Sequence, residues 1–171
     1  MIKKILYRLL GPAGYLRVVS RTFFFLLNGG WLRSQPAFFN HYMIRELVKD
    51  GDVVLDIGAN LGYYTIPLSD LCGPSGKVIA VEPVELFRRV LVRNLGRRSN
   101  VEILACALGE EEGKEIEMGI PSGHKNFRHG LTHVLSPGER DAQTMVFKAV
   151  MRDPRLLFAG FERLDLIKCD V

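Results

Sequence analysis

The chain has 171 residues, of which 47% are hydrophobic and 25% charged, and its formal net charge is +4. This length favours one domain that can bury its own core, and the composition excludes a globally disordered chain. The positive charge is confined to one end. Residues 1–45 hold seven Lys or Arg and no acid, whereas the remainder holds 16 bases against 19 acids. The basic character therefore belongs to an N-terminal arm.

The three cysteines, Cys72, Cys106 and Cys169, form no CxxC motif and are odd in number. Cys106 and Cys169 lie within apolar runs, where cysteine usually behaves as a small buried hydrophobe. We therefore expect reduced structural thiols in a cytoplasmic protein rather than disulfides or metal ligands.

The N-terminal arm contains two helical segments, residues 2–10 and 15–27, separated by Gly11-Pro12. Arginines interrupt both apolar runs, so neither predicts a membrane span or a secretory signal. The two helices can cover the core of the following domain, or lie on an anionic membrane surface through residues 1–30. Their aromatic residues do not alternate with bases as in a nucleic-acid stacking surface, so we expect no nucleic-acid partner.

A helix is predicted next, at residues 36–49, where Pro36 suits the first turn. Its apolar face is expected to comprise Phe39, Tyr42, Met43, Leu47 and Val48. The turn Asp50-Gly51-Asp52 ends this helix and leads into the first strand.

Strands and helices then alternate along the chain. We predict strands at residues 53–57, 77–82 and 101–108, with helices at 62–71 and 84–95 between them. The first strand is apolar except for Asp56, as expected of a parallel strand covered on both faces. This alternation predicts an α/β fold with a Rossmann-like doubly wound sheet.

After Gly109 the pattern changes. We expect a strand at 115–118, a loop at 119–143, a strand at 144–150, a short helix at 154–160 and a last strand at 164–171. The loop holds His124, His129 and His133, the last two spaced four apart. No nearby Asp, Glu or Cys completes a ligand set, so we expect no metal site. Contact with a substrate and a solvated loop both remain open.

The turn at residues 58–62 reads Gly-Ala-Asn-Leu-Gly and differs from the dinucleotide fingerprint GxGxxG, because Asn60 replaces its second glycine. Asparagine tolerates the left-handed backbone better than most residues, so the turn survives although a pyrophosphate can no longer approach closely. Glu82 ends the next strand, where a carboxylate can bind a ribose diol. Ordinary turn glycines and a strand-end acid are the alternative, but their spacing on consecutive strands favours S-adenosylmethionine.

Residues 56–65, the Val-Glu-Pro run at 81–83 and the last stretch, 165–171, resemble the FkbM-type methyltransferases. These are S-adenosylmethionine-dependent enzymes, largely O-methyltransferases of sugars and natural products, and the resemblance covers residues 44–171. It implies that the methionine part of the cofactor is held by Asp56, Gly58, Asn60 and Gly62, its ribose by Glu82, and that its adenine lies near Ala107 and Leu108.

The family pattern continues after Asp170-Val171 with Glu-Gly and further strands and helices. We therefore expect residues 36–171 to be the N-terminal part of a methyltransferase domain without its C-terminal strands, behind a basic helical extension at 1–35. Asp170 follows the last strand at the edge where open α/β sheets bind ligands. It is a candidate for binding the cofactor amino group, orienting the substrate or acting as the base, and an ordinary strand-end aspartate is the alternative.

The expected function is O-methylation of a hydroxyl group on a small molecule or glycan, such as a sugar, a glycolipid or a natural product. The alternative is a truncated, non-catalytic chain that binds the cofactor or acts as an interaction module at a membrane surface. Both place the protein in the cytoplasm, with peripheral membrane contact through residues 1–30 as one option.

Overall fold

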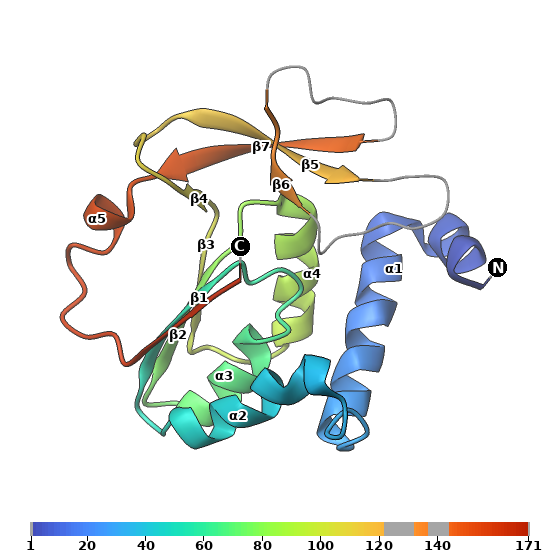
Figure 1. The fold of residues 1–171 in the computed structure, drawn as a ribbon, viewed down its shortest axis with the longest axis horizontal. Helices are drawn as coiled ribbons and strands as arrows, with labels where there is room; N and C mark the ends of the chain where they lie inside the picture. Colours follow the sequence, from blue (N-terminus) through green and yellow to red (C-terminus); the bar gives the residue numbers. More distant parts are fainter. Residues whose placement is uncertain (1, 122–131, 137–143, 171) are drawn as a thin grey trace.

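The structure is a computed structural model that describes residues 2–121, 132–136 and 144–170. Its helices are α1 (Ile2–Asn28), α2 (Phe39–Leu47), α3 (Thr65–Cys72), α4 (Glu85–Leu95) and α5 (Pro154–Leu157), with a 3-10 turn η1 (Pro36–Phe38). Its strands are β1 (Val53–Ile57), β2 (Lys77–Val81), β3 (Val101–Leu104), β4 (Ala107–Leu108), β5 (Glu115–Pro121), β6 (His133–Val134), β7 (Thr144–Arg152) and β8 (Leu166–Cys169). Figure 1 shows these elements in sequence colours.

A four-stranded parallel sheet in the order β3-β2-β1-β8 forms the centre of the fold, which confirms the predicted α/β class. The register places Asp56 of β1 between Ala80 of β2 and Lys168 of β8. All four carboxyl ends therefore lie along one edge of the sheet, where ligands of open α/β sheets bind.

Two different layers cover the two faces of this sheet. On one face, Val54 and Val78 pack against Leu68 of α3. On the other face, Leu55 and Ile79 pack in a cluster with side chains from the segment between β7 and β8: Leu157, Phe158, Phe161 and Leu164. The inner strands are buried on both faces, which explains why they are apolar apart from Asp56 of β1 and Lys77 at the exposed start of β2.

The edge strand β8 alternates between half-buried and exposed residues, unlike the inner strands. Cys169 is consequently exposed, although its apolar neighbours had suggested a buried thiol. Cys72 and Cys106 are buried, and all three cysteines are free thiols.

A second sheet, in the order β4-β7-β5-β6, lies beyond the carboxyl edge of the parallel sheet (Figure 1). The strand expected at 101–108 is therefore wrong as a single element. β3 ends at Leu104, and Ala107 pairs with Met151 of β7 instead. Leu104 accepts a last hydrogen bond from the amide of Glu82. The next amide on that side of the chain, that of Val84, donates to the Glu82 carboxylate instead, so the ladder between β2 and β3 ends there.

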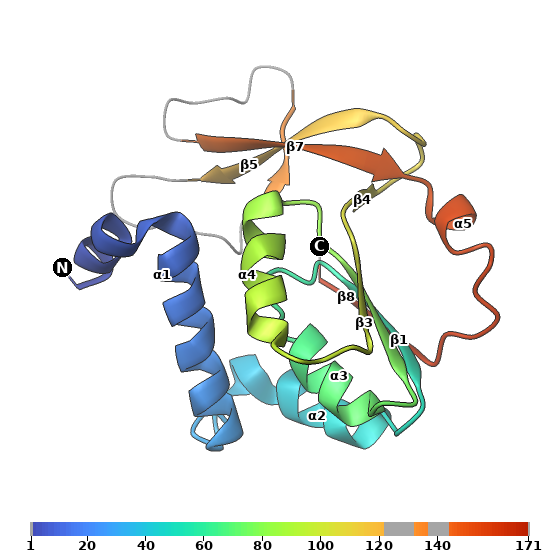
Figure 2. The same cartoon turned by 180° about the vertical axis from the view of Figure 1, so that it is seen from behind.

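The N-terminal arm breaks at Gly11, as its sequence predicts, where φ is 65° and ψ is 177°. The second half of α1 runs beside α4 (Figures 1 and 2). Tyr15 and Leu16 are buried in a core cluster there, whereas Leu9, before the break, is exposed. Among the described residues, no helix is both long enough and apolar enough to cross a membrane.

Helix α2 turns a different face to the core from the one expected. His41 and Ile44, followed by Val48, are buried, whereas Phe39, Met43 and Leu47 are exposed. The three buried positions are spaced three and four apart and so share one face of the helix. Apolar residues occupy two faces of α2, and packing against β1 selects the face that carries His41.

Candidate functional site

The turn after β1 has a left-handed backbone at three positions: φ is 75° at Gly58, 51° at Asn60 and 90° at Gly62. Asn60 has the only positive φ of a non-glycine residue in the described part of the chain, which confirms that asparagine sustains this turn. The amides of Gly58 and Ala59 both donate to the carbonyl of Val81, at 3.0 Å each, and so tie the turn to β2.

Gly62 is required for packing as well as for backbone conformation. A Cβ atom there would lie 2.7 Å from Leu91 Cδ1 and 3.2 Å from Ile66 Cδ1, both in the core under α3 and α4. Its α-carbon therefore faces the core. Helix α3 begins only at Thr65, three residues later than predicted, because the turn extends through Tyr63 and Tyr64.

Replacing Gly62 by alanine is expected to lower the free energy of unfolding by about 2–4 kcal/mol, since backbone strain and overpacking add. Gly96 is the matched control: its φ is +64°, but a Cβ there meets nothing within 4 Å. Gly96→Ala should therefore cost only about 1 kcal/mol. Urea unfolding of both variants measures the difference, and equal losses would contradict the packing role of Gly62.

Asp56 lies at the centre of the carboxyl edge with 0% of its surface exposed. Its Oδ2 accepts a 2.6 Å hydrogen bond from the Thr65 hydroxyl, and its Oδ1 lies 3.1 Å from Lys168 Nζ. Lys168 also donates to the carbonyls of Ile57 and Gly58, at 3.3 Å each. The Thr65 hydrogen bond therefore joins the end of β1 to α3, and the contacts of Lys168 join it and the start of the glycine turn to β8.

Lys168 is the main residue that the sequence analysis missed. Its signal was a single lysine inside the apolar run Leu166-Ile167-Lys168-Cys169. A lysine in an apolar strand is ordinary when it points to solvent. Only the pairing of β8 with β1 places it opposite Asp56.

Glu82 follows β2 and is 4% exposed. Its Oε2 accepts a 2.7 Å hydrogen bond from the amide of Asn60, and its Oε1 accepts one of 2.8 Å from the amide of Val84. Burial raises the pKa of this carboxyl to about 7, although both backbone bonds act in the opposite direction. Each oxygen keeps a free lone pair, so the carboxylate can accept further hydrogen bonds.

An aromatic wall borders the site on the side of α2. The rings of His41 and Tyr64 stack with centroids 4.0 Å apart, and Lys168 Nζ lies 4.9 Å from the Tyr64 centroid. Within the described residues, neither nitrogen of the buried His41 ring has a hydrogen-bond partner. Burial lowers the His41 pKa to about 4, with a further decrease from Lys168 and an opposing effect of Asp170. The imidazole is therefore neutral at physiological pH. The neighbouring Tyr63 packs on Phe23 instead, 4.7 Å between centroids.

The other predicted residues lie at different distances from this centre. Asp170 is at the carboxyl edge, with its side chain 76% exposed and its Oδ2 3.7 Å from Lys168 Nζ. Ala107 and Leu108 are on β4, in the second sheet, and Leu108 packs on the cluster that contains Val81. The structure thus brings Asp56, Gly58, Asn60 and Glu82 together, and the roles of all these residues remain predictions.

The histidine-rich loop falls mostly outside the described residues, which include neither His124 nor His129. His133 lies on β6 and is exposed. Within residues 2–121, 132–136 and 144–170, no three His, Cys, Asp or Glu side chains are grouped so that they could hold a metal ion.

A family model described as Protein-L-isoaspartate(D-aspartate) O-methyltransferase matches residues 31–113, which include the glycine turn and Glu82. The chain is 30% identical over 98 residues to the protein-L-isoaspartate O-methyltransferase of Methanothrix thermoacetophila, covering 54% of this chain and 47% of that protein. It is 36% identical over 90 residues to the AMB antimetabolite synthetase AmbE of Pseudomonas aeruginosa, covering 52% of this chain and 4% of that protein. The chain thus spans less than half the length of these relatives.

Two solved structures are also similar over part of the chain. An S-adenosylmethionine-dependent methyltransferase from Aquifex aeolicus is 29% identical, with a TM-score of 0.36 and coverage of 47% of this chain and 44% of that one. The fibrillarin of Aeropyrum pernix, crystallised with bound S-adenosyl-L-methionine, is 31% identical, with a TM-score of 0.33 and coverage of 34% and 25%. The matching family model is not the FkbM type that the motifs resemble. That model and the relative from Methanothrix support the broader group of S-adenosylmethionine-dependent methyltransferases.

Proposed function

The chain belongs to the superfamily of S-adenosylmethionine-dependent methyltransferases, and from that premise we propose that it binds this cofactor at the carboxyl ends of β1 and β2 for methyl transfer to a hydroxyl oxygen. The observation that carries the proposal is the 2.7 Å bond from the amide of Asn60 to the carboxylate of Glu82. This bond joins the glycine turn and the strand-end acid in one buried site.

The polar groups of the site fit the cofactor. Glu82 has the free lone pairs that a ribose diol needs as acceptors. Asn60 Oδ1 is buried and, among the described residues, has no hydrogen-bond partner, so it suits the cofactor ammonium group. Asp56 is already engaged by Thr65 and Lys168. We therefore assign Glu82 and Asn60 to direct binding, and Asp56 to holding the turn in place.

When bound, S-adenosylmethionine supplies a methyl group on a sulfonium, which leaves as a neutral thioether and needs no acid. The residues of the chain then have two tasks, which are to orient the acceptor and to remove its proton. We assign the removal of the hydroxyl proton to the Asp170 carboxylate, whose side chain is exposed where an acceptor can approach. The neutral ring of His41, stacked on Tyr64 with both of its nitrogens buried, forms part of the wall beside the site.

The proposed chemical class of the methyl acceptor rests on the last motif of the sequence, residues 165–171. Residues 165–171, which resemble the FkbM-type enzymes, lie outside the segment matched by the isoaspartate O-methyltransferase model. They also provide Lys168 and Asp170, which border the site. This favours a hydroxyl group of a sugar, glycolipid or natural product over the carboxylate of an isoaspartyl residue.

S-adenosylhomocysteine is expected to raise the melting temperature of the purified chain by about 5–10 °C at about a hundredfold excess over its Kd. Differential scanning fluorimetry measures the shift, and S-inosylhomocysteine is a ligand control with an altered base. An unchanged melting temperature at saturating ligand would refute cofactor binding by this chain.

The acceptor is tested separately, by transfer of labelled methyl from the cofactor to a panel of glycans, glycolipids and an isoaspartyl peptide. Asp170→Asn should lower hydroxyl methylation at least about a hundredfold while leaving the S-adenosylhomocysteine shift intact. Labelling of the isoaspartyl peptide alone would overturn the hydroxyl assignment. Ligand binding without transfer to any acceptor would instead identify the chain as a non-catalytic cofactor-binding module.

A further inference from the structure

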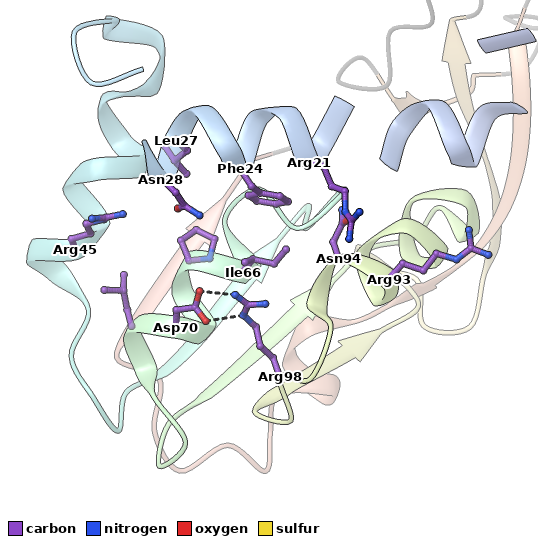
Figure 3. A pocket seen from close by; sticks show the side chains of 12 residues that line it. Arg21, Phe24, Leu27, Asn28, Arg45, Ile66, Asp70, Arg93, Asn94 and Arg98 are labelled. Carbon is purple, nitrogen blue, oxygen red and sulfur yellow. Dashed lines mark hydrogen bonds and ion pairs between the residues drawn. The ribbon is translucent and has the colours of Figure 1, made fainter. Parts of the chain in front are cut away.

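A cavity of about 350 Å³ lies away from the carboxyl edge, between α1, α3 and α4 (Figure 3). Its size is within the range of small-ligand sites. Its floor is apolar, formed by Phe24 and Leu27 of α1 and by Ile66, Pro67 and Leu71 of α3. Nothing in the proposed methyl transfer uses this space.

Four arginines line the cavity: Arg21 of α1, Arg45 of α2, Arg93 of α4 and Arg98 after α4. One carboxylate, Asp70, faces them, and both of its oxygens are taken by Arg98 at 2.7 Å (Figure 3). Among the described residues, the other three arginines form no ion pair. The cavity therefore has a cationic rim with unused charge above an apolar floor.

The surface beside this rim is apolar and exposed. Val18, Arg21 and Phe25 are three and four residues apart, so they share one face of α1. Phe25 is 71% exposed, and so is Trp31, three residues after the end of the helix. Exposed aromatic side chains next to unpaired arginines are the surface chemistry of proteins that lie on anionic membranes.

We propose that this cavity and the adjoining face of α1 bind an anionic phospholipid at a membrane surface. The phosphate lies against the arginines, the first carbons of the acyl chains lie on the apolar floor, and Phe25 and Trp31 enter the interface. The absence of any acid in residues 1–45 supports this orientation, because no carboxylate on the arm repels the lipid.

Trp31 is the single tryptophan of the chain and therefore reports the contact directly. Its emission is expected to shift to the blue with vesicles of phosphatidylcholine containing phosphatidic acid, and not with phosphatidylcholine alone. Arg21→Gln/Arg45→Gln should weaken vesicle partitioning by about 30-fold. The matched control, Arg89→Gln/Arg97→Gln, removes the same charge from exposed arginines outside the cavity and should weaken it by less than about 3-fold.

Three outcomes would overturn the proposal. One is the absence of a blue shift with the acidic vesicles. Another is an equal loss in the two double variants, which would indicate general charge attraction without a site. The third is a rise in melting temperature with inorganic pyrophosphate that depends on Arg21 and Arg45, without vesicle binding, because it would identify a soluble phosphate ligand.

Discussion

Replacing Lys168 by methionine is expected to lower the free energy of unfolding by about 3–5 kcal/mol, because the substitution leaves the Asp56 carboxylate buried without its cation. Asp56 is fully buried and Lys168 nearly so, so solvent screens neither charge well. The substitution also removes the bonds from Nζ to the carbonyls of Ile57 and Gly58. Urea unfolding followed by circular dichroism measures the loss.

Two controls isolate the buried charge as the cause. Lys148→Met removes an exposed lysine whose partner, Glu115, is also exposed, and it should cost less than about 1 kcal/mol. The double variant Asp56→Asn/Lys168→Met should recover part of the stability, because it removes both charges and leaves the Thr65 hydroxyl an amide oxygen to bind. A double variant as unstable as the sum of its single substitutions would contradict this explanation.

The affinity for S-adenosylhomocysteine is expected to fall about tenfold between pH 8 and pH 6, because ribose hydroxyls bind the ionised carboxylate of Glu82 and its pKa is about 7. Without ligand, the raised pKa has the opposite consequence for folding. The folded state holds the Glu82 proton more tightly than the unfolded state, whose pKa is near 4.5. The stability that this proton contributes is therefore fully present below pH 4.5 and is lost as the pH rises through 7. Isothermal titration calorimetry across this range measures the first effect.

Glu82→Gln should weaken binding at pH 8 by about 10- to 100-fold and flatten its pH dependence, since the amide does not titrate. Glu85→Gln is the matched control: it removes an exposed carboxylate three residues away and should leave both the affinity and its pH dependence unchanged. Because the glutamine leaves one backbone amide of the site without an acceptor, the melting temperature of each variant is compared first without ligand. A pH dependence that persists in Glu82→Gln would belong to the ligand and refute the role of Glu82.

The sequence predicted those parts of the molecule in which local chemistry and tertiary structure agree. The apolar run at β1, the left-handed Asn60 and the acid at the end of β2 each have a local signature, and their spacing predicted one shared edge. The break at Gly11 is of the same kind, because glycine followed by proline disfavours a continuous helix whatever surrounds it.

The parts that could not be predicted depend on partners distant in sequence. Lys168 meets Asp56 only because β8 pairs with β1, and β3 ends early because the next amide, that of Val84, donates to the Glu82 carboxylate. His41 was missed because α2 carries apolar residues on two faces, and the choice between them is made by packing and not by periodicity. Such features follow from the pairing of strands and the docking of helices, which no local pattern records.

The contact between Lys168 and Gly58 joins residues 110 positions apart. Closing so long a loop costs entropy before any contact compensates for it, so pairings of this kind tend to form late in folding. During synthesis, the glycine turn therefore emerges from the ribosome long before the lysine that holds it. The bonds of the turn to Val81 and Glu82 span little more than twenty residues and can form first, whereas the bonds from Lys168 are added only when β8 docks beside β1.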